Sequence, residues 1–139
     1  MMDDKNLEAP KILVVDDYND NLVIMSLSLQ GMGYRVVTAS NGEEAILVAM
    51  LARPDLILMD ISMPQLDGFA AARRVHENEE LKEVPIVAVT AFATEGFRQA
   101  AFDADFKGYL VKPIDFDKLQ KLIEMLLRPK HTSSIKPLL

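Results

Sequence analysis

The chain contains the segment Leu56-Ile57-Leu58-Met59-Asp60-Ile61-Ser62-Met63-Pro64, in which four apolar residues lead into one carboxylate. Such a short apolar run is typical of a β-strand that is covered on both faces. We expect this strand to end before Asp60, because an acidic side chain is rarely buried and Pro64 indicates a turn. Asp60 is therefore predicted to lie where the strand leaves its sheet.

Three more apolar runs also lead into polar side chains. Residues 12–15 precede Asp16-Asp17, residues 86–89 precede Thr90, and residues 109–111 precede Lys112-Pro113. In an open parallel α/β sheet, ligands bind at the edge formed by the carboxyl ends of the strands. We therefore predict that these carboxylates, the hydroxyl and the amine meet in one site.

The rest of the chain alternates between strand and helix patterns. Strands are predicted at about 11–15, 34–39, 55–59, 86–89 and 107–111, and helices at about 19–32, 42–53, 68–80, 94–103 and 116–128. Asn41 and Asp115 are candidate helix caps, with Glu44 at the reciprocal capping position. This alternation predicts a three-layer, doubly wound α/β fold with a parallel sheet. We expect a flexible segment at 1–10, one domain at 11–128 and a flexible tail at 129–139.

Composition excludes several classes of protein. The 139 residues include no cysteine, which excludes disulfides and thiolate metal sites. The start is polar, and no apolar stretch approaches the roughly 20 residues that span a bilayer. We therefore expect a cytoplasmic protein with no membrane partner. The net charge of −6 argues against sequence-independent binding to nucleic acid.

The clustered carboxylates predict a bound cation. At an effective dielectric constant of about 20, two like charges about 4 Å apart repel by about 4 kcal/mol. Such a cluster either raises its pKa values or holds a cation. Oxygen ligands favour Mg²⁺, or Mn²⁺, over metals that prefer nitrogen or sulfur. An aspartate nucleophile, a metal, the Lys112 amine and the Thr90 hydroxyl are together the parts needed to form an acyl phosphate.

These motifs resemble a response-regulator receiver domain of two-component signalling, similar to chemotaxis regulators and to the receivers of hybrid kinases and phosphorelays. The resemblance rests on residues 11–17, 60–64 with 67–68, 89–91 and 108–113, and it covers about residues 11–127. It implies a flavodoxin-like fold with five parallel strands in the order 2-1-3-4-5 and five helices.

The resemblance also implies how a phosphoryl group is bound. Asp60 corresponds to the phosphoacceptor. Thr90 and the backbone amide of Ala91 would bind phosphoryl oxygens, and Lys112 would pair with the phosphoryl group. The Lys112-Pro113 peptide bond is expected to be cis.

The same resemblance implies a metal site and a switch. Asp17, Asp60 and the backbone carbonyl of Ser62 would ligate Mg²⁺ directly, and Asp16 would act through water. Thr90 would move toward the phosphoryl group while Tyr109, which matches the switch aromatic, swings inward.

The implied partners are proteins. A sensor histidine kinase or a histidine phosphotransfer protein would supply the phosphoryl group. A separate target would bind the face made by the fourth helix, the last strand and the last helix. The protein would be a monomer or a phosphorylation-promoted dimer. We expect no enzyme activity beyond Mg²⁺-dependent self-phosphorylation and autodephosphorylation.

Three positions need separate expectations. Asp105 stands where many receivers have glycine, so we expect a left-handed conformation at a cost that glycine avoids. Lys107 stands where an acid is common. His76 lies in a charged stretch and is expected to be solvated.

Other classes of protein remain to be separated from this interpretation. Haloacid-dehalogenase-type phosphatases also use an aspartate nucleophile with Mg²⁺, but they place a second acid where this chain has Ser62. A flavodoxin-like cofactor binder needs a Ser/Thr/Gly-rich phosphate loop after the first strand, where this chain has acids. A receiver-shaped adaptor that works without phosphorylation is the third alternative.

Overall fold

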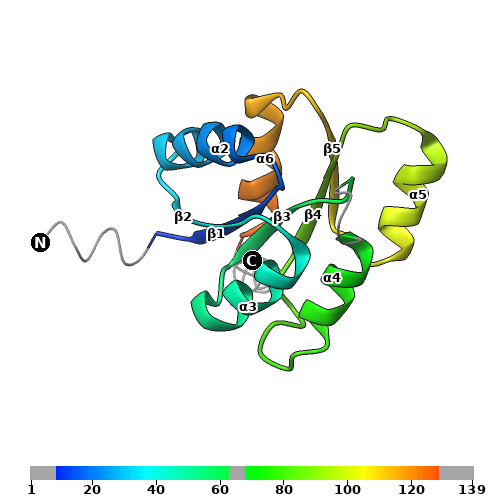
Figure 1. Cartoon of the computed structure of the whole chain (residues 1–139). Helices are drawn as coiled ribbons and strands as arrows, with labels where there is room; N and C mark the ends of the chain where they lie inside the picture. The colour runs from blue at the N-terminus through cyan, green and yellow to red at the C-terminus, as the bar shows by residue number, and fades with distance from the viewer. Residues whose placement is uncertain (1–8, 63–67, 129–139) are drawn as a thin grey trace, which may run out of the picture.

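The computed structural model describes residues 9–62 and 68–128. Five parallel strands form one sheet in the order β2-β1-β3-β4-β5 (Figure 1). Their bounds are β1 Lys11–Val15, β2 Arg35–Ala39, β3 Leu56–Asp60, β4 Ile86–Thr90 and β5 Gly108–Val111. Every pairing is parallel, so the carboxyl ends of all five strands lie at the same edge. The predicted fold and strand order are confirmed.

Five helices cover the two faces of this sheet. They are α2 Asn19–Gly31, α3 Gly42–Ala52, α4 Gly68–His76, α5 Glu95–Asp103 and α6 Phe116–Leu126. Alternate residues of the strands pack against α2 and α6 on one face and against α3, α4 and α5 on the other (Figure 1). β3 and β4 are buried along their whole length, which explains why their sequences are apolar rather than alternating.

Side-chain caps mark where three of the helices begin, α3, α5 and α6. The Asn41 side chain accepts a hydrogen bond from the Glu44 amide at the start of α3, and Asp115 accepts two from the first turn of α6. The reciprocal bond of Glu44 differs from the expectation. Its carboxylate accepts from the amide and hydroxyl of Ser40, one residue before the cap.

The expectation that Asp60 lies beyond its strand is wrong. Asp60 is the last residue of β3, pairs with Val89 of β4 and is buried, and Thr90 similarly ends β4. The strand can include a buried acid because both carboxylate oxygens have hydrogen-bonding partners, Ser62 and Lys112.

The third predicted helix, at about 68–80, is shorter than expected, and His76 is not solvated. α4 ends at His76, and the chain then turns so that Leu81 can be buried in the core. The His76 side chain is 17% exposed, its Nε2 lies 2.8 Å from the Val84 carbonyl oxygen, and its Nδ1 faces Asp105. The histidine therefore connects α4 to the segments that lead into β4 and β5.

Asp105 adopts the left-handed conformation that its position requires, with φ 73°. The turn it makes after α5 allows the amide of Phe106 to bond to the Ala101 carbonyl and buries the Phe106 ring. Pro64, Asp67 and most of the two predicted flexible ends lie outside the described residues. Across the described ranges, no helix is long and apolar enough to cross a membrane.

Candidate functional site

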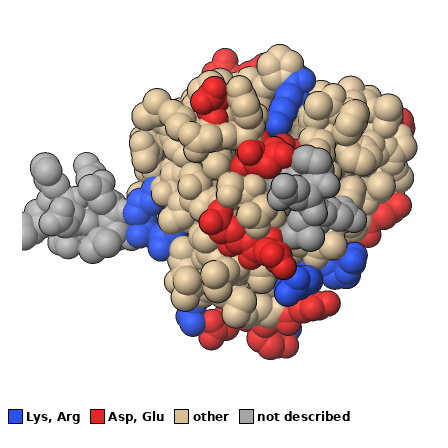
Figure 2. All heavy atoms as spheres, in the orientation of Figure 1, with Lys and Arg blue, Asp and Glu red and all other residues tan. Residues whose placement is uncertain are grey.

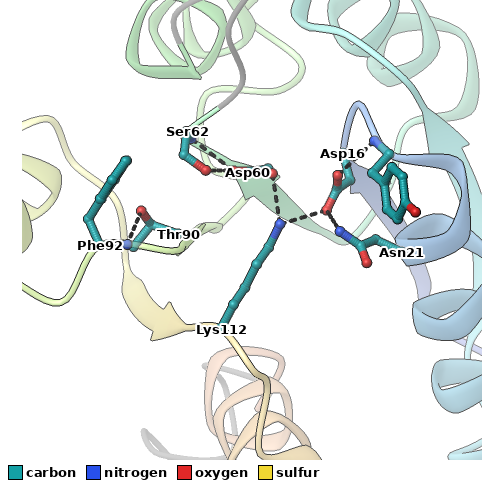
Figure 3. Close-up of polar contacts among 8 residues, drawn as sticks. Asp16, Asn21, Asp60, Ser62, Thr90, Phe92 and Lys112 are labelled. Carbon is teal, nitrogen blue, oxygen red and sulfur yellow. Dashed lines mark hydrogen bonds and ion pairs between the residues drawn. The ribbon is translucent and has the colours of Figure 1, made fainter.

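The polar side chains singled out in the sequence meet at the carboxyl edge of the sheet. Asp16 follows β1, Asp60 ends β3, Thr90 ends β4 and Lys112 follows β5. Figure 3 shows Lys112 reaching between Asp16 and Asp60, with Thr90 to one side. The parallel register places neighbouring strand ends side by side, which brings residues as far apart as 16 and 112 into contact.

Lys112 bridges two buried carboxylates. Its Nζ donates to Asp60 Oδ2 at 3.0 Å and to Asp16 Oδ2 at 3.1 Å. Burial would lower the pKa of Lys112, but the hydrogen bonds and charges of Asp60 and Asp16 together outweigh it and raise that pKa. The lysine is therefore a fixed positive charge in the site at neutral pH.

Ser62 holds the other oxygen of Asp60. Asp60 Oδ1 accepts from the Ser62 backbone N–H at 2.8 Å and from its hydroxyl at 2.6 Å. The sequence analysis assigned Ser62 only a backbone role and missed this hydroxyl. The signal was available, because a serine two residues after an aspartate at a strand end is typical of a side-chain-stabilised turn.

Asp16 is fixed by groups from the start of α2. Its Oδ1 accepts from the Tyr18 amide at 2.9 Å, and its Oδ2 accepts from Asn21 Nδ2 at 3.2 Å. Asn21 was not predicted, because from the sequence it is one polar residue among several in the first turn of a helix. Asp16 is thus held in place while its neighbour Asp17 is exposed.

Three carboxylates are close enough to share one cation. Asp16, Asp17 and Asp60 can each offer an oxygen such that the three atoms lie within 4.8 Å of one another. Acidic side chains gather near the middle of the face seen in Figure 2, with basic side chains beside them. One lysine does not neutralise three carboxylates. The all-oxygen donor set therefore fits a hard divalent ion such as Mg²⁺.

Thr90 and Tyr109 are linked through the backbone of Phe92. Thr90 is fully buried, and its hydroxyl accepts from the Phe92 N–H at 3.0 Å. The Tyr109 hydroxyl donates to the Phe92 carbonyl at 2.6 Å. Burial raises the pKa of Tyr109, with opposing effects from Arg98 and Glu95. Ala91, which lies between Thr90 and Phe92 in the chain, is exposed. The Lys112-Pro113 peptide bond, which follows β5, is cis.

Comparison with known families identifies the family to which this chain belongs. Residues 12–124 match the model of the response regulator receiver domain. The chain therefore belongs to the response regulator receiver family, the signalling modules of two-component and phosphorelay systems.

Relatives with this domain occur both alone and within longer proteins. The chain is 32% identical over 116 residues to the polar-differentiation response regulator DivK of Brucella anthropi, covering 84% of this chain and 94% of that protein. It is 36% identical over 132 residues to the signal transduction histidine-protein kinase BarA of Escherichia coli, covering 95% of this chain but 14% of BarA.

Solved structures show the same architecture. Chemotaxis protein CheY4 of Vibrio cholerae superimposes with a TM-score of 0.81 at 34% identity, covering 86% of this chain and 99% of that one. The receiver domain of a sensor histidine kinase from Pseudomonas aeruginosa gives 0.80 at 35% identity, covering 87% and 99%. That structure has a magnesium ion coordinated in its active site cleft.

Proposed function

We propose that Asp60 accepts a phosphoryl group from a phosphohistidine of a sensor kinase or a histidine phosphotransfer protein. The observation that carries this proposal is the bridge from Lys112 to Asp60 and Asp16, beside a cluster of three carboxylates. The candidate nucleophile Asp60, the ammonium group of Lys112 and the candidate metal site thus lie next to one another.

The chemical step is a displacement at phosphorus. An oxygen of Asp60 forms the new P–O bond, the P–N bond breaks, and the histidine nitrogen leaves with the electron pair. Lys112 is already at Asp60 Oδ2 and would donate to a phosphoryl oxygen there. The Thr90 hydroxyl and the Ala91 N–H would donate to the others.

A divalent cation fits the acidic group beside the nucleophile. Asp17, Asp60 and the Ser62 carbonyl would hold Mg²⁺ or Mn²⁺, with Asp16 acting through water. The ion would supply positive charge to the phosphoryl oxygens. The magnesium in the Pseudomonas aeruginosa receiver domain supports this assignment.

The switch would act through Phe92. If Thr90 turns toward the phosphoryl group, its hydroxyl no longer accepts from the Phe92 N–H. The backbone that also binds Tyr109 is then released, and Tyr109 can move inward. The face made by α5, β5 and α6 would present this change to a separate protein target, with the protein as a monomer or a phosphorylation-promoted dimer. Residues 11–128 would be the working unit, in the cytoplasm.

Intact mass after incubation with acetyl phosphate tests the proposal. We expect wild type to gain one phosphoryl group with Mg²⁺ and none with a chelator, and Asp60→Asn to gain none. A gain in Asp60→Asn equal to that of wild type would contradict the assignment. No gain in wild type under any condition would favour an adaptor that binds partners without phosphorylation.

A further inference from the structure

A cavity of about 490 Å³ opens beside the acidic site. Its lining residues belong to the face of the sheet that α2 and α6 cover, and Figure 1 shows the position of these two helices. Most of its walls are apolar. They include Val14 and Val89 from the strands, Ile24 and Met25 from α2, Ile114 from the segment between β5 and α6, and Phe116 at the start of α6. Its volume lies within the range of about 300 to 1,000 Å³ that small-molecule pockets occupy.

One end of the cavity is polar. Asp16, Asn21 and Lys112 line it, and Figure 3 shows the three side chains converging. Lys112 has three N–H donors, of which Asp16 and Asp60 accept two. Asn21 donates to Asp16, and its Oδ1 accepts no hydrogen bond from the described residues. One N–H of Lys112, the second N–H of Asn21 and the Asn21 Oδ1 therefore remain available at this end. A single hydroxyl group can bridge Lys112 and Asn21, because it accepts from the ammonium and donates to the amide oxygen at once.

Charge selects against an anionic group at this end. The one ammonium, which contacts Asp16 and Asp60, lies beside a cluster of three carboxylates, so without a bound divalent cation the local charge is negative and would repel a carboxylate or phosphate. We propose that the cavity binds an uncharged, mainly apolar molecule with one hydroxyl group, a phenol or an alkanol, whose hydroxyl lies between Lys112 and Asn21.

Exposed apolar side chains at the mouth of the cavity indicate that most of the ligand is apolar. Ile24 is 56% exposed and Phe116 is 36% exposed, and both line the cavity. A bound molecule would remove these two side chains from water, which supplies a hydrophobic driving force. A ligand hydroxyl on Lys112 would also hold the lysine in its bridge to Asp16. The proposed binding does not rest on the proposed function.

Titration of the full chain with 4-propylphenol, followed by amide NMR without any phosphoryl donor, tests the proposal. We expect saturable shifts centred on residues 14–16, 21–25 and 112–116. Net hydrogen-bond energies imply that 4-propylphenol binds roughly two- to tenfold tighter than propylbenzene. It should also bind more tightly than 4-propylbenzoate. Equal affinity for propylbenzene, tightest binding of the benzoate, or no saturable shift would each overturn the proposal.

Two matched variants on α2 locate the site. Leu27 is 64% exposed and lies outside the cavity lining, so Leu27→Asn is the control for Ile24→Asn. We expect Ile24→Asn to weaken 4-propylphenol binding by about fivefold through lost apolar contact. Leu27→Asn should bind as wild type does. Both positions are exposed, and the amide spectrum verifies that each variant is folded. Equal effects of the two variants would show that the phenol binds elsewhere.

Discussion

At the scale of single residues, Lys112 determines the electrostatics of the site. It is the one basic side chain among the described residues that contacts Asp16 and Asp60, and both of those carboxylates are buried. A divalent cation placed among the same acids would be repelled by Lys112 at short range. The lysine would therefore limit cation affinity and, under the proposed function, would at the same time supply a donor for a phosphoryl oxygen.

Replacing Lys112 should therefore tighten Mg²⁺ binding. We expect Lys112→Met to lower the Kd for Mg²⁺ by about three- to tenfold, because a nearby positive charge is lost, and to slow phosphorylation by acetyl phosphate. Isothermal titration calorimetry measures the first effect and intact mass the second. Lys107→Met is the control, because Lys107 pairs with Asp105 rather than with the site acids. Unchanged or weaker Mg²⁺ binding in Lys112→Met would contradict this account.

Residue types at strand ends were predictable, but their detailed contacts were not. Asp16, Asp60, Thr90 and Lys112 could be selected because each follows or ends an apolar run. The role of Asn21 depends on side-chain direction, which a linear pattern does not contain, whereas the turn signal at Ser62 was present in the sequence.

At the scale of elements, α4 begins against the end of β3. A Cβ atom added at Gly68 would lie 2.8 Å from the Ile61 Cα and 3.0 Å from the Asp60 carbonyl oxygen. Backbone atoms cannot move aside cheaply, so only glycine allows this close approach. The beginning of α4 is thereby fixed next to the residue that we propose as phosphoacceptor.

Substitution at two glycines tests this packing. We expect Gly68→Ala to lower the free energy of unfolding by about 1 to 3 kcal/mol, because of overpacking. Gly31→Ala should leave it unchanged or raise it by up to about 1 kcal/mol, since nothing lies within 4 Å and alanine favours helix. Urea denaturation measures both. A Gly68→Ala variant as stable as wild type would show that α4 can shift without cost.

The cap of α6 allows a second test at this scale. Asp115 accepts hydrogen bonds from the amides of Asp117 and Lys118. Asp115→Ala should therefore cost about 1 kcal/mol of stability in urea denaturation. Asp117→Ala, two residues later in the first turn of α6, removes no cap and should cost less. Equal losses would mean that helix-dipole charge, rather than capping, fixes the start of α6.

Element types were predictable because both faces of the sheet are covered, which makes strand sequences apolar throughout. Element ends were less predictable. Hydrogen bonding to Ser62 and Lys112 keeps Asp60 within β3, and burial of Leu81 ends α4 early. Both effects come from tertiary contacts.

At the scale of the whole molecule, folding itself assembles the acidic cluster. Asp16 and Asp17 follow β1 and Asp60 ends β3, and these segments meet only in the folded sheet. A cation that binds all three carboxylates therefore binds the folded state selectively. The net charge of −6 adds a general response to salt, which any test must separate from specific binding.

Thermal unfolding with Mg²⁺ makes that separation. At a hundredfold excess over its Kd, Mg²⁺ should add about 2.7 kcal/mol of stability and raise the Tm by several degrees. NaCl at matched ionic strength should raise it less. Asp17→Asn should lose most of the Mg²⁺-specific increase, whereas Asp20→Asn, an exposed acid outside the cluster, should keep it. An equal increase in both variants would point to general screening.

The central claim is that Asp60, among the three clustered carboxylates, carries the phosphoryl group. Borohydride reduction of the protein after treatment with acetyl phosphate and Mg²⁺ converts a phosphorylated aspartate to homoserine, which peptide mass spectrometry then locates. We predict homoserine at Asp60, with Asp16 and Asp17 unmodified. Homoserine at Asp16 or Asp17 instead, or at none of the three, would contradict the account.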